Sequence, residues 1–187
     1  LGMYDFSDKD DGVNLATYAN VYGMYQPDAI STFSVGGSAY YVTANEGDAR
    51  DYWFDAADEA ACLAAGGLEY DDEDGCLAYS EEVRLDDLDL YDTVFPDEDD
   101  LLDKEALGRL KTTTANNCGD SDGDGDLDFI CSYGTRSFSI WDSNGALVWD
   151  SGDSISALMA SQGEYINSYT QKRNDDKGAE PEGVVVG

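Results

Sequence analysis

The stretch CGDSDGDGDLDFICSYGTRSFSIWDSNGALVWD, residues 118–150, decides the fold expected for this chain. Its first part places an aspartate at every second position, with two glycines that let the backbone curl. Several carboxylate oxygens can then turn toward one point, which suits Ca²⁺ because this ion takes about 6–8 oxygen ligands in a flexible shell. We therefore predict a calcium-binding loop over residues 118–131. The expected ligands are the side chains of Asp120, Asp122 and Asp124, the backbone carbonyl of Asp126, and Asp128 directly or through water.

The sequence around this loop does not fit an EF-hand. An EF-hand loop ends on a bidentate glutamate, but Cys131 occupies that position and no helical pattern flanks the loop. Residues 129–133 and 137–141 instead have the composition of β-strands. The loop is similar to the calcium loops that lie between strands in integrin-type β-propellers. The alternative interpretation is a solvated acidic turn in a very acidic protein.

The composition limits the classes of partner. Among 187 residues, 41 are Asp or Glu and only 10 are Lys or Arg, so the formal net charge is −31. Nucleic acids and anionic membrane surfaces would be repelled by this charge, and we expect neither as a partner. The chain has no histidine, which removes the commonest general base. It also has no apolar run of about 20 residues, so the sequence predicts no transmembrane segment in this portion.

The four cysteines form two local pairs along the sequence. Cys62 and Cys76 flank one acidic loop, and Cys118 and Cys131 flank the predicted calcium loop. Four cysteines allow three pairings, and we favour the two local ones because each would close a loop whose charges repel one another. Disulfides place the protein outside the cytoplasm. Zinc is the rival interpretation, but a C-x₂-C unit and histidine are both missing.

Strand-like segments separated by turns follow one another along most of the chain. Two pairs of such segments, within residues 29–43 and 137–149, each surround a glycine-containing turn that is typical of a β-hairpin. Helical patterns occur at residues 55–65 and 154–161, and residues 55–103 are expected to form an acidic loop excursion from the sheet. These patterns predict an all-β fold, either a sandwich or a propeller, with short helices in the connecting loops.

Seven motifs of the chain recur in the same order in one family. They are SDKDDGVNL (7–15), MYQPDAI (24–30), TANEGDARDY (43–52), LGRL (107–110), GTRSFSIWD (134–142), VWDSG (148–152) and DDKGAEPEGV (175–184). On these motifs the chain resembles the choice-of-anchor I family, which is related to mesenchyme-specific cell-surface glycoproteins and more loosely similar to esterase-like phytases. The resemblance implies a β-propeller that is secreted or anchored at the cell surface. Because family members are much longer, residues 1–187 would form one partial segment of about three blades, packed against the rest of the propeller.

The resemblance also draws attention to a second group of charged residues. Strand ends in a propeller gather at one face, so these residues could converge and hold a calcium-bridged phosphate, with arginine binding two of its oxygens. The alternative, which we favour, is an ion-pair network that ties blades together. The group comprises Glu46, Asp48, Arg50, Asp51, Arg136, Glu180 and Glu182.

Two classes of function follow. The first is a non-catalytic, calcium-stabilised surface protein, which agrees with the charge, the cysteines and the lack of a G-x-S-x-G nucleophile motif. The second is a calcium-dependent phosphoesterase of the alkaline phosphatase or phytase-like kind, in which a metal-bound water would replace the missing histidine base. Self-assembly into extracellular filaments is a third possibility, but no motif in the sequence supports it. We favour the first; no catalytic residue can be assigned.

Overall fold

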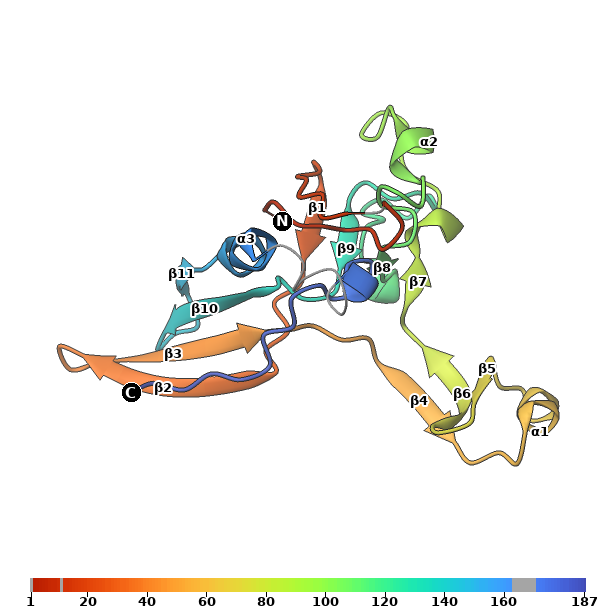
Figure 1. Cartoon of the computed structure of the whole chain (residues 1–187), viewed down its shortest axis with the longest axis horizontal. Helices are drawn as coiled ribbons and strands as arrows, with labels where there is room; N and C mark the ends of the chain where they lie inside the picture. The colour runs from red at the N-terminus through yellow and green to blue at the C-terminus, as the bar shows by residue number, and fades with distance from the viewer. Residues whose placement is uncertain (1, 11, 163–170) are drawn as a thin grey trace. The chain divides into compact units, whose positions relative to one another are not determined.

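The computed structural model describes residues 2–10, 12–162 and 171–187 (Figure 1). The chain is mostly β, with a few short helices. It divides into two compact units. The larger unit comprises Leu1–Asp48 and Val83–Gly187, and the smaller unit comprises Ala49–Glu82.

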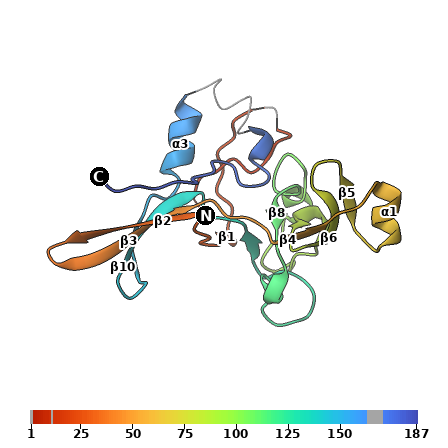
Figure 2. The same ribbon diagram turned by 90° about the horizontal axis from the view of Figure 1, so that it is seen from below.

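A four-stranded antiparallel sheet in the larger unit contains the two hairpins expected from the sequence. Its order is β11-β10-β3-β2, from β2 (Ala29–Val35), β3 (Ser38–Asn45), β10 (Ser137–Asp142) and β11 (Leu147–Asp150). Gly37 and Gly145 turn the two hairpins at φ of 86° and 81°, which only glycine adopts at little cost. The predicted second helix follows as α3 (Ser154–Ser161), which lies on one side of this sheet (Figures 1 and 2).

A second sheet of the larger unit joins segments that are far apart in the sequence. Its order is β1-β9-β8-β7, from β1 (Val21–Gly23), β7 (Val83–Arg84), β8 (Lys111–Thr112) and β9 (Ile130–Ser132). Strands β1 and β9 are parallel, whereas β8 pairs antiparallel with both β7 and β9. Sequence reasoning did not identify β1, because three residues are too short for an alternating pattern to be visible.

The main hydrophobic core lies beside this second sheet and has one feature that matters for the site. Two core residues, Leu127 and Ile130, come from the end of the acidic 118–131 loop. The buried members are Tyr4, Phe6, Val21, Leu85, Leu90, Phe95, Leu107, Leu110, Leu127 and Ile130. In the described part of this unit, further short helices are η1 (Leu85–Asp87), α2 (Glu98–Leu101), η2 (Ala115–Asn117) and η4 (Gln171–Arg173).

The smaller unit is a three-stranded antiparallel sheet with one helix. The sheet order is β4-β6-β5, from β4 (Asp51–Phe54), β5 (Glu69–Asp71) and β6 (Gly75–Ser80). Helix α1 (Glu59–Ala64) starts where the Asp58 carboxylate accepts a hydrogen bond from the Ala61 amide at 2.8 Å. The Cys62–Cys76 disulfide joins α1 to β6, and Figure 2 shows the helix beside this sheet.

The bounds of the acidic excursion differ from what the sequence predicts, whereas the three-blade propeller stays a prediction. The excursion was expected over residues 55–103, but the compact smaller unit is Ala49–Glu82, and residues 83–103 contribute Leu85, Leu90 and Phe95 to the main core. The described residues also do not close into a barrel or a propeller; they form three open sheets, one of which has a parallel pair. Hairpins are local and can be read from turn residues, whereas pairing between distant strands depends on long-range packing that short motifs do not encode.

Candidate functional site

The base of the acidic 118–131 loop is fixed to the core of the larger unit. A disulfide joins Cys118 and Cys131, whose Cα atoms are 6.1 Å apart. The Gly119 carbonyl accepts a hydrogen bond from the Asp128 amide at 2.8 Å, and Leu127 is 3% exposed within the core. The Leu127 amide also donates to the Asp89 carbonyl at 2.9 Å. The aspartates of the loop are therefore held on a rigid base.

The upper part of the loop brings three carboxylates together. Asp120 accepts hydrogen bonds from the amides of Gly123 at 2.6 Å and Gly125 at 3.2 Å. Both glycines have positive φ, 84° and 105°, so the backbone curls around the Asp120 side chain. As a result, one carboxylate oxygen from each of Asp120, Asp122 and Asp124 lies within 4.8 Å of the others. These are the three residues predicted to bind calcium through their side chains.

The other two predicted ligands have different surroundings. The Asp126 amide donates to Asp124 Oδ1 at 3.3 Å, which helps to turn the backbone. Asp128 Oδ2 accepts hydrogen bonds from the Ser121 amide at 2.9 Å and from the Ser121 hydroxyl. One oxygen of Asp128 thus stabilises the loop itself, and the alternating pattern could not show this because it says nothing about the serine between the aspartates.

The carboxylates of the loop raise one another's affinity for positive charge. The negative charge of Asp124 is the main cause of a raised pKa at Asp122. At Asp126 the pKa is raised by partial desolvation and then by Asp124. The pKa of Asp128 is lowered instead, because Ser121 donates hydrogen bonds to its charged form. A cation bound among these oxygens would offset the repulsion at Asp122 and Asp124.

A second group of convergent carboxylates is partly balanced by two cations of the protein. Oxygens of Glu46, Glu180 and Glu182 lie within 4.8 Å of one another. Lys177 Nζ is 3.0 Å from Glu46 Oε1 and also 3.0 Å from Asp48 Oδ2. Arg173 Nε donates to Glu180 Oε1 at 2.7 Å. These contacts form an ion-pair network, which was one of the two interpretations left open for this group.

Arg136, which was expected to act with these carboxylates, is buried and uses its terminal nitrogens on backbone carbonyls instead. Its side chain is 1% exposed and donates to the backbone carbonyls of Asp5 and Asn174, both at 2.9 Å, and of Asp176 at 3.0 Å. The guanidinium also lies over the ring of Phe6, 5.2 Å from its centroid. Burial lowers the pKa of Arg136 to about 10, so the side chain is still charged at neutral pH.

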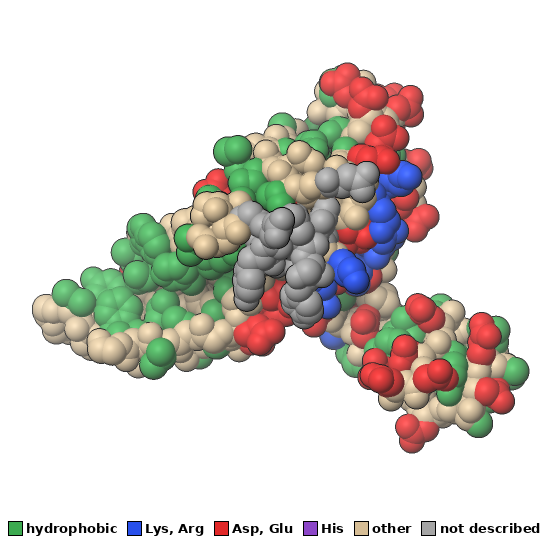
Figure 3. Space-filling view, viewed as in Figure 1, with side chains coloured by type: hydrophobic (Ala, Val, Ile, Leu, Met, Phe, Trp, Pro, Cys, Tyr) green, Lys and Arg blue, Asp and Glu red, His purple; other side chains and the backbone are tan. Residues whose placement is uncertain are grey.

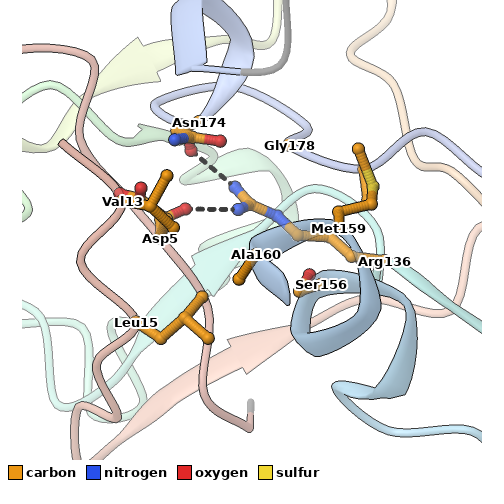
Figure 4. A pocket seen from close by; sticks show the side chains of 10 residues that line it. Asp5, Val13, Leu15, Arg136, Ser156, Met159, Ala160, Asn174 and Gly178 are labelled. Atoms are coloured by element: carbon orange, nitrogen blue, oxygen red, sulfur yellow. Dashed lines mark hydrogen bonds between the residues drawn. The ribbon is translucent and has the colours of Figure 1, made fainter. Parts of the chain in front are cut away.

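The surroundings of Arg136 are those of a structural anchor. Its own φ is 54°, a conformation that costs a non-glycine residue about 1–2 kcal/mol, and its contacts must offset that cost. A Cβ on Gly178 would lie 2.6 Å from the guanidinium, so glycine is required there. A pocket beside Arg136, lined also by Asp5 and Met159, holds about 20 Å³, enough for one water-sized molecule (Figure 4).

The remaining two residues of the predicted cluster, Arg50 and Asp51, belong to the smaller unit. There, Arg50 NH2 lies 2.5 Å from Glu81 Oε1, and its guanidinium remains largely exposed. Asp51 is exposed and begins strand β4. Arg50 thus already has a carboxylate partner within its own unit.

The structure reveals a charged centre that sequence reasoning missed. Asp175 Oδ2 receives hydrogen bonds from Arg84 NH1 at 2.7 Å and Arg109 NH2 at 3.2 Å. Arg109 Nε also donates to Asp8 Oδ1 at 2.8 Å, and Lys111 pairs with Asp176. Figure 3 shows that Lys and Arg side chains gather on one part of this face. The motifs around 7–15, 107–110 and 175–184 contain most of these residues, so their joint recurrence was an available signal.

A family model matches this chain over residues 2–187, and its description is "Choice-of-anchor I domain". The chain belongs to this family. No curated protein and no solved structure matches the chain with significant similarity. Membership suggests a surface-associated domain, and the two disulfides are consistent with an extracellular protein. None of the helices in the described part of the chain has the length and apolar character needed to cross a bilayer.

Proposed function

We propose that this choice-of-anchor I domain is an extracellular, calcium-stabilised surface domain with a structural or binding role. The observation that carries the proposal is the convergence of Asp120, Asp122 and Asp124 in a loop whose base is tied to the core. Hard oxygen ligands on a glycine-rich loop suit Ca²⁺ better than Mg²⁺, because Mg²⁺ demands near-octahedral geometry and loses its water reluctantly.

Calcium would act here as an electrostatic clamp. Without a cation, the charge of Asp124 opposes ionisation of Asp122, and this repulsion favours opening of the loop. With a cation, the same charges attract a common centre. Because the loop leads directly into Ile130 of β9, bound calcium would also stabilise the sheet that contains β1, β8 and β7. Calcium binding would thus stabilise the larger unit.

The alternative function is a calcium-dependent phosphoesterase. Its phosphate would need free arginine donors, and the two candidate arginines are engaged elsewhere. Arg136 uses both terminal nitrogens on backbone carbonyls, and Arg50 pairs with Glu81. The pocket beside Arg136 is also far smaller than a typical substrate pocket of about 300–1,000 Å³. These contacts favour the structural role over the catalytic one.

The four-stranded antiparallel sheet β11-β10-β3-β2 is our candidate for one blade of a larger propeller, of which this chain would contain about three blades. Like a propeller blade it has four strands with antiparallel pairing, although the neighbouring strands β3 and β10 come from distant parts of the chain. The family resemblance supports this assignment. A structure of a longer protein that contains residues 1–187 would test it, and a closed sandwich around this sheet would contradict it.

Calorimetric titration of the folded chain with CaCl₂ tests the main proposal. We expect saturable binding in wild type, much weaker binding of MgCl₂, and at least a tenfold loss of calcium affinity in Asp124→Ala, since one of three convergent ligands is removed. Asp72→Ala is the matched control, because Asp72 is an exposed aspartate of the other disulfide-closed loop. Equal affinities in the two variants would show that 118–131 is a solvated turn.

A further inference from the structure

The smaller unit exposes aromatic side chains on neighbouring strands. Tyr52 of β4 and Tyr79 of β6 are directly paired in the sheet, and their ring centroids are 5.7 Å apart. Tyr52 is 54% exposed, Tyr79 is 44% exposed and Trp53 is 38% exposed. Leu63 and Leu68 add exposed apolar surface in the same unit. The exposed Tyr52–Tyr79 pair therefore offers two adjacent aromatic faces to a partner.

The charge around this aromatic surface has one sign. Residues 49–82 contain eleven acidic residues and one basic residue, Arg50, which is a formal net charge of −10. In the space-filling view the carboxylates of this unit lie between its apolar side chains (Figure 3). A partner must therefore tolerate, or use, a strongly negative surface together with aromatic rings.

Arg50 provides an internal example of a cation on this surface. Its guanidinium pairs with Glu81 Oε1 at 2.5 Å and interacts with the side chain of Tyr52. The side chain is 62% exposed in this position, so burial does not hold it there. A carboxylate and a tyrosine thus hold an exposed guanidinium at one end of the aromatic pair.

From these observations we propose that the Tyr52–Tyr79 surface of the smaller unit binds a Lys- or Arg-rich polypeptide segment. Cationic side chains would lie over the exposed rings and pair with nearby carboxylates, as Arg50 pairs with Glu81. This inference does not depend on calcium binding by the 118–131 loop, because its residues belong to a separate unit.

The charge argues against other occupants of the surface. A second copy of the unit would bring another −10 against it, and nucleic acid or an anionic lipid surface would be repelled in the same way. An uncharged apolar partner would cover the rings but leave the surrounding carboxylates partly desolvated, which costs free energy. A cationic segment is the partner that can both cover the aromatic rings and pair with the surrounding carboxylates.

Fluorescence anisotropy of a labelled ten-residue oligoarginine peptide, titrated with the full chain at fixed calcium and salt, tests the proposal. Tyr52→Thr/Tyr79→Thr leaves the charge unchanged and introduces residues that favour strands, and it should weaken binding about tenfold because two cation–π contacts are lost. The matched control is Asp97→Asn/Asp99→Asn/Asp100→Asn. It removes three charges from an acidic segment of the larger unit and leaves the aromatic pair intact, so it should change affinity less than threefold.

A third variant keeps the proposal testable even if the tyrosine variant misfolds. Arg50→Gln removes the cation that occupies Glu81, and it should tighten peptide binding severalfold if the surface is the one proposed. If the Asp97/Asp99/Asp100 variant weakens binding more than the tyrosine variant does, binding follows net charge and the proposal is wrong. Unchanged affinity in both the tyrosine variant and Arg50→Gln would also overturn it.

Discussion

The two disulfide-closed loops of this protein have nearly the same chemistry but different geometry. Residues 62–76 and 118–131 each contain five acidic residues between two bonded cysteines. In 118–131, three carboxylates converge around a glycine-rich curl. In 62–76, the acidic residues follow one another around a β-hairpin, where Asp71 accepts hydrogen bonds from the amides of Glu73 at 2.7 Å and Asp74 at 3.0 Å.

This difference shows that the amount of negative charge does not by itself bring carboxylate oxygens together. Consecutive acidic residues in a hairpin point to different sides, so their oxygens have no common centre. Alternating aspartates with glycines at positive φ can turn their oxygens inward. The pKa shifts differ in the same way. The negative charge of Asp124 is the main cause of the raised pKa of Asp122, whereas hydrogen bonds from backbone amides lower the pKa of Asp71.

The largest expected effect is the loss of either disulfide. Closing a loop of about 15 residues is worth about 3 kcal/mol. Cys62→Ala/Cys76→Ala should unfold the smaller unit, because a segment of fewer than about 40 residues rarely folds without a covalent link. Cys118→Ala/Cys131→Ala should destabilise the larger unit and weaken calcium binding. Amide hydrogen exchange, resolved by residue, measures both. Equal losses of calcium affinity in the two variants would contradict the distinction between the loops.

The second-largest expected effect is the change in melting temperature on calcium binding, which should depend on the 118–131 loop and not on the 62–76 loop. At a calcium concentration one hundred times Kd, binding to the native state alone stabilises it by about 2.7 kcal/mol, or about 5–10 °C in a chain of this size. We expect this shift in wild type and in Asp72→Ala when calcium replaces chelator, and most of it to be absent in Asp124→Ala. Melting curves of the three proteins in both buffers provide the measurement. A full calcium response in Asp124→Ala would remove the loop from consideration as a metal site.

Two glycines offer a smaller and closely matched test. Gly66 and Gly123 have φ of 87° and 84°, and a Cβ on either would meet nothing within 4 Å. Gly66→Ala and Gly123→Ala should therefore each cost about 1–2 kcal/mol from backbone strain alone. Only Gly123→Ala should reduce calcium affinity, because only that curl positions carboxylates. Denaturant unfolding measures the loss of stability, and calorimetric titration measures the calcium affinity. A reduced calcium affinity in Gly66→Ala would count against the proposed geometry.

The smallest effect concerns pH. Because the folded-state pKa of Asp122 is raised, its contribution opposes folding at neutral pH, and this penalty disappears as the pH falls through that pKa. Asp71 has a lowered pKa, so it contributes stability above its unfolded pKa and loses it as the pH falls through the folded value. Carboxyl NMR titrations should give a midpoint above 3.8 for Asp122 and below 3.8 for Asp71. Calcium should lower the midpoint of Asp122 and leave the midpoint of Asp71 unchanged.

The candidate site could be predicted from the sequence only where it is local. The spacing of Asp120, Asp122 and Asp124 was sufficient to expect their convergence, because the three lie close together in the sequence and Gly123 and Gly125 let the backbone curl. The second charged cluster could not be predicted in the same way. Arg50 and Arg136 share a charge and a motif context, yet one is exposed beside Glu81 and the other is buried against backbone carbonyls.

What the sequence by itself determined are the short-range features: the hairpins at Gly36-Gly37 and Asn144-Gly145, the helix over 154–161, the local cysteine pairs and the acidic loop. Each depends on turn residues or spacing within about 15 residues, where chain connectivity limits the choices. Only the tertiary structure decided the pairing of β1 with β9, the burial of Arg136, and the binding of Arg84 and Arg109 to Asp175. Those contacts join residues that are 38 or more positions apart along the chain, and their formation depends on which surfaces the whole chain can bury together.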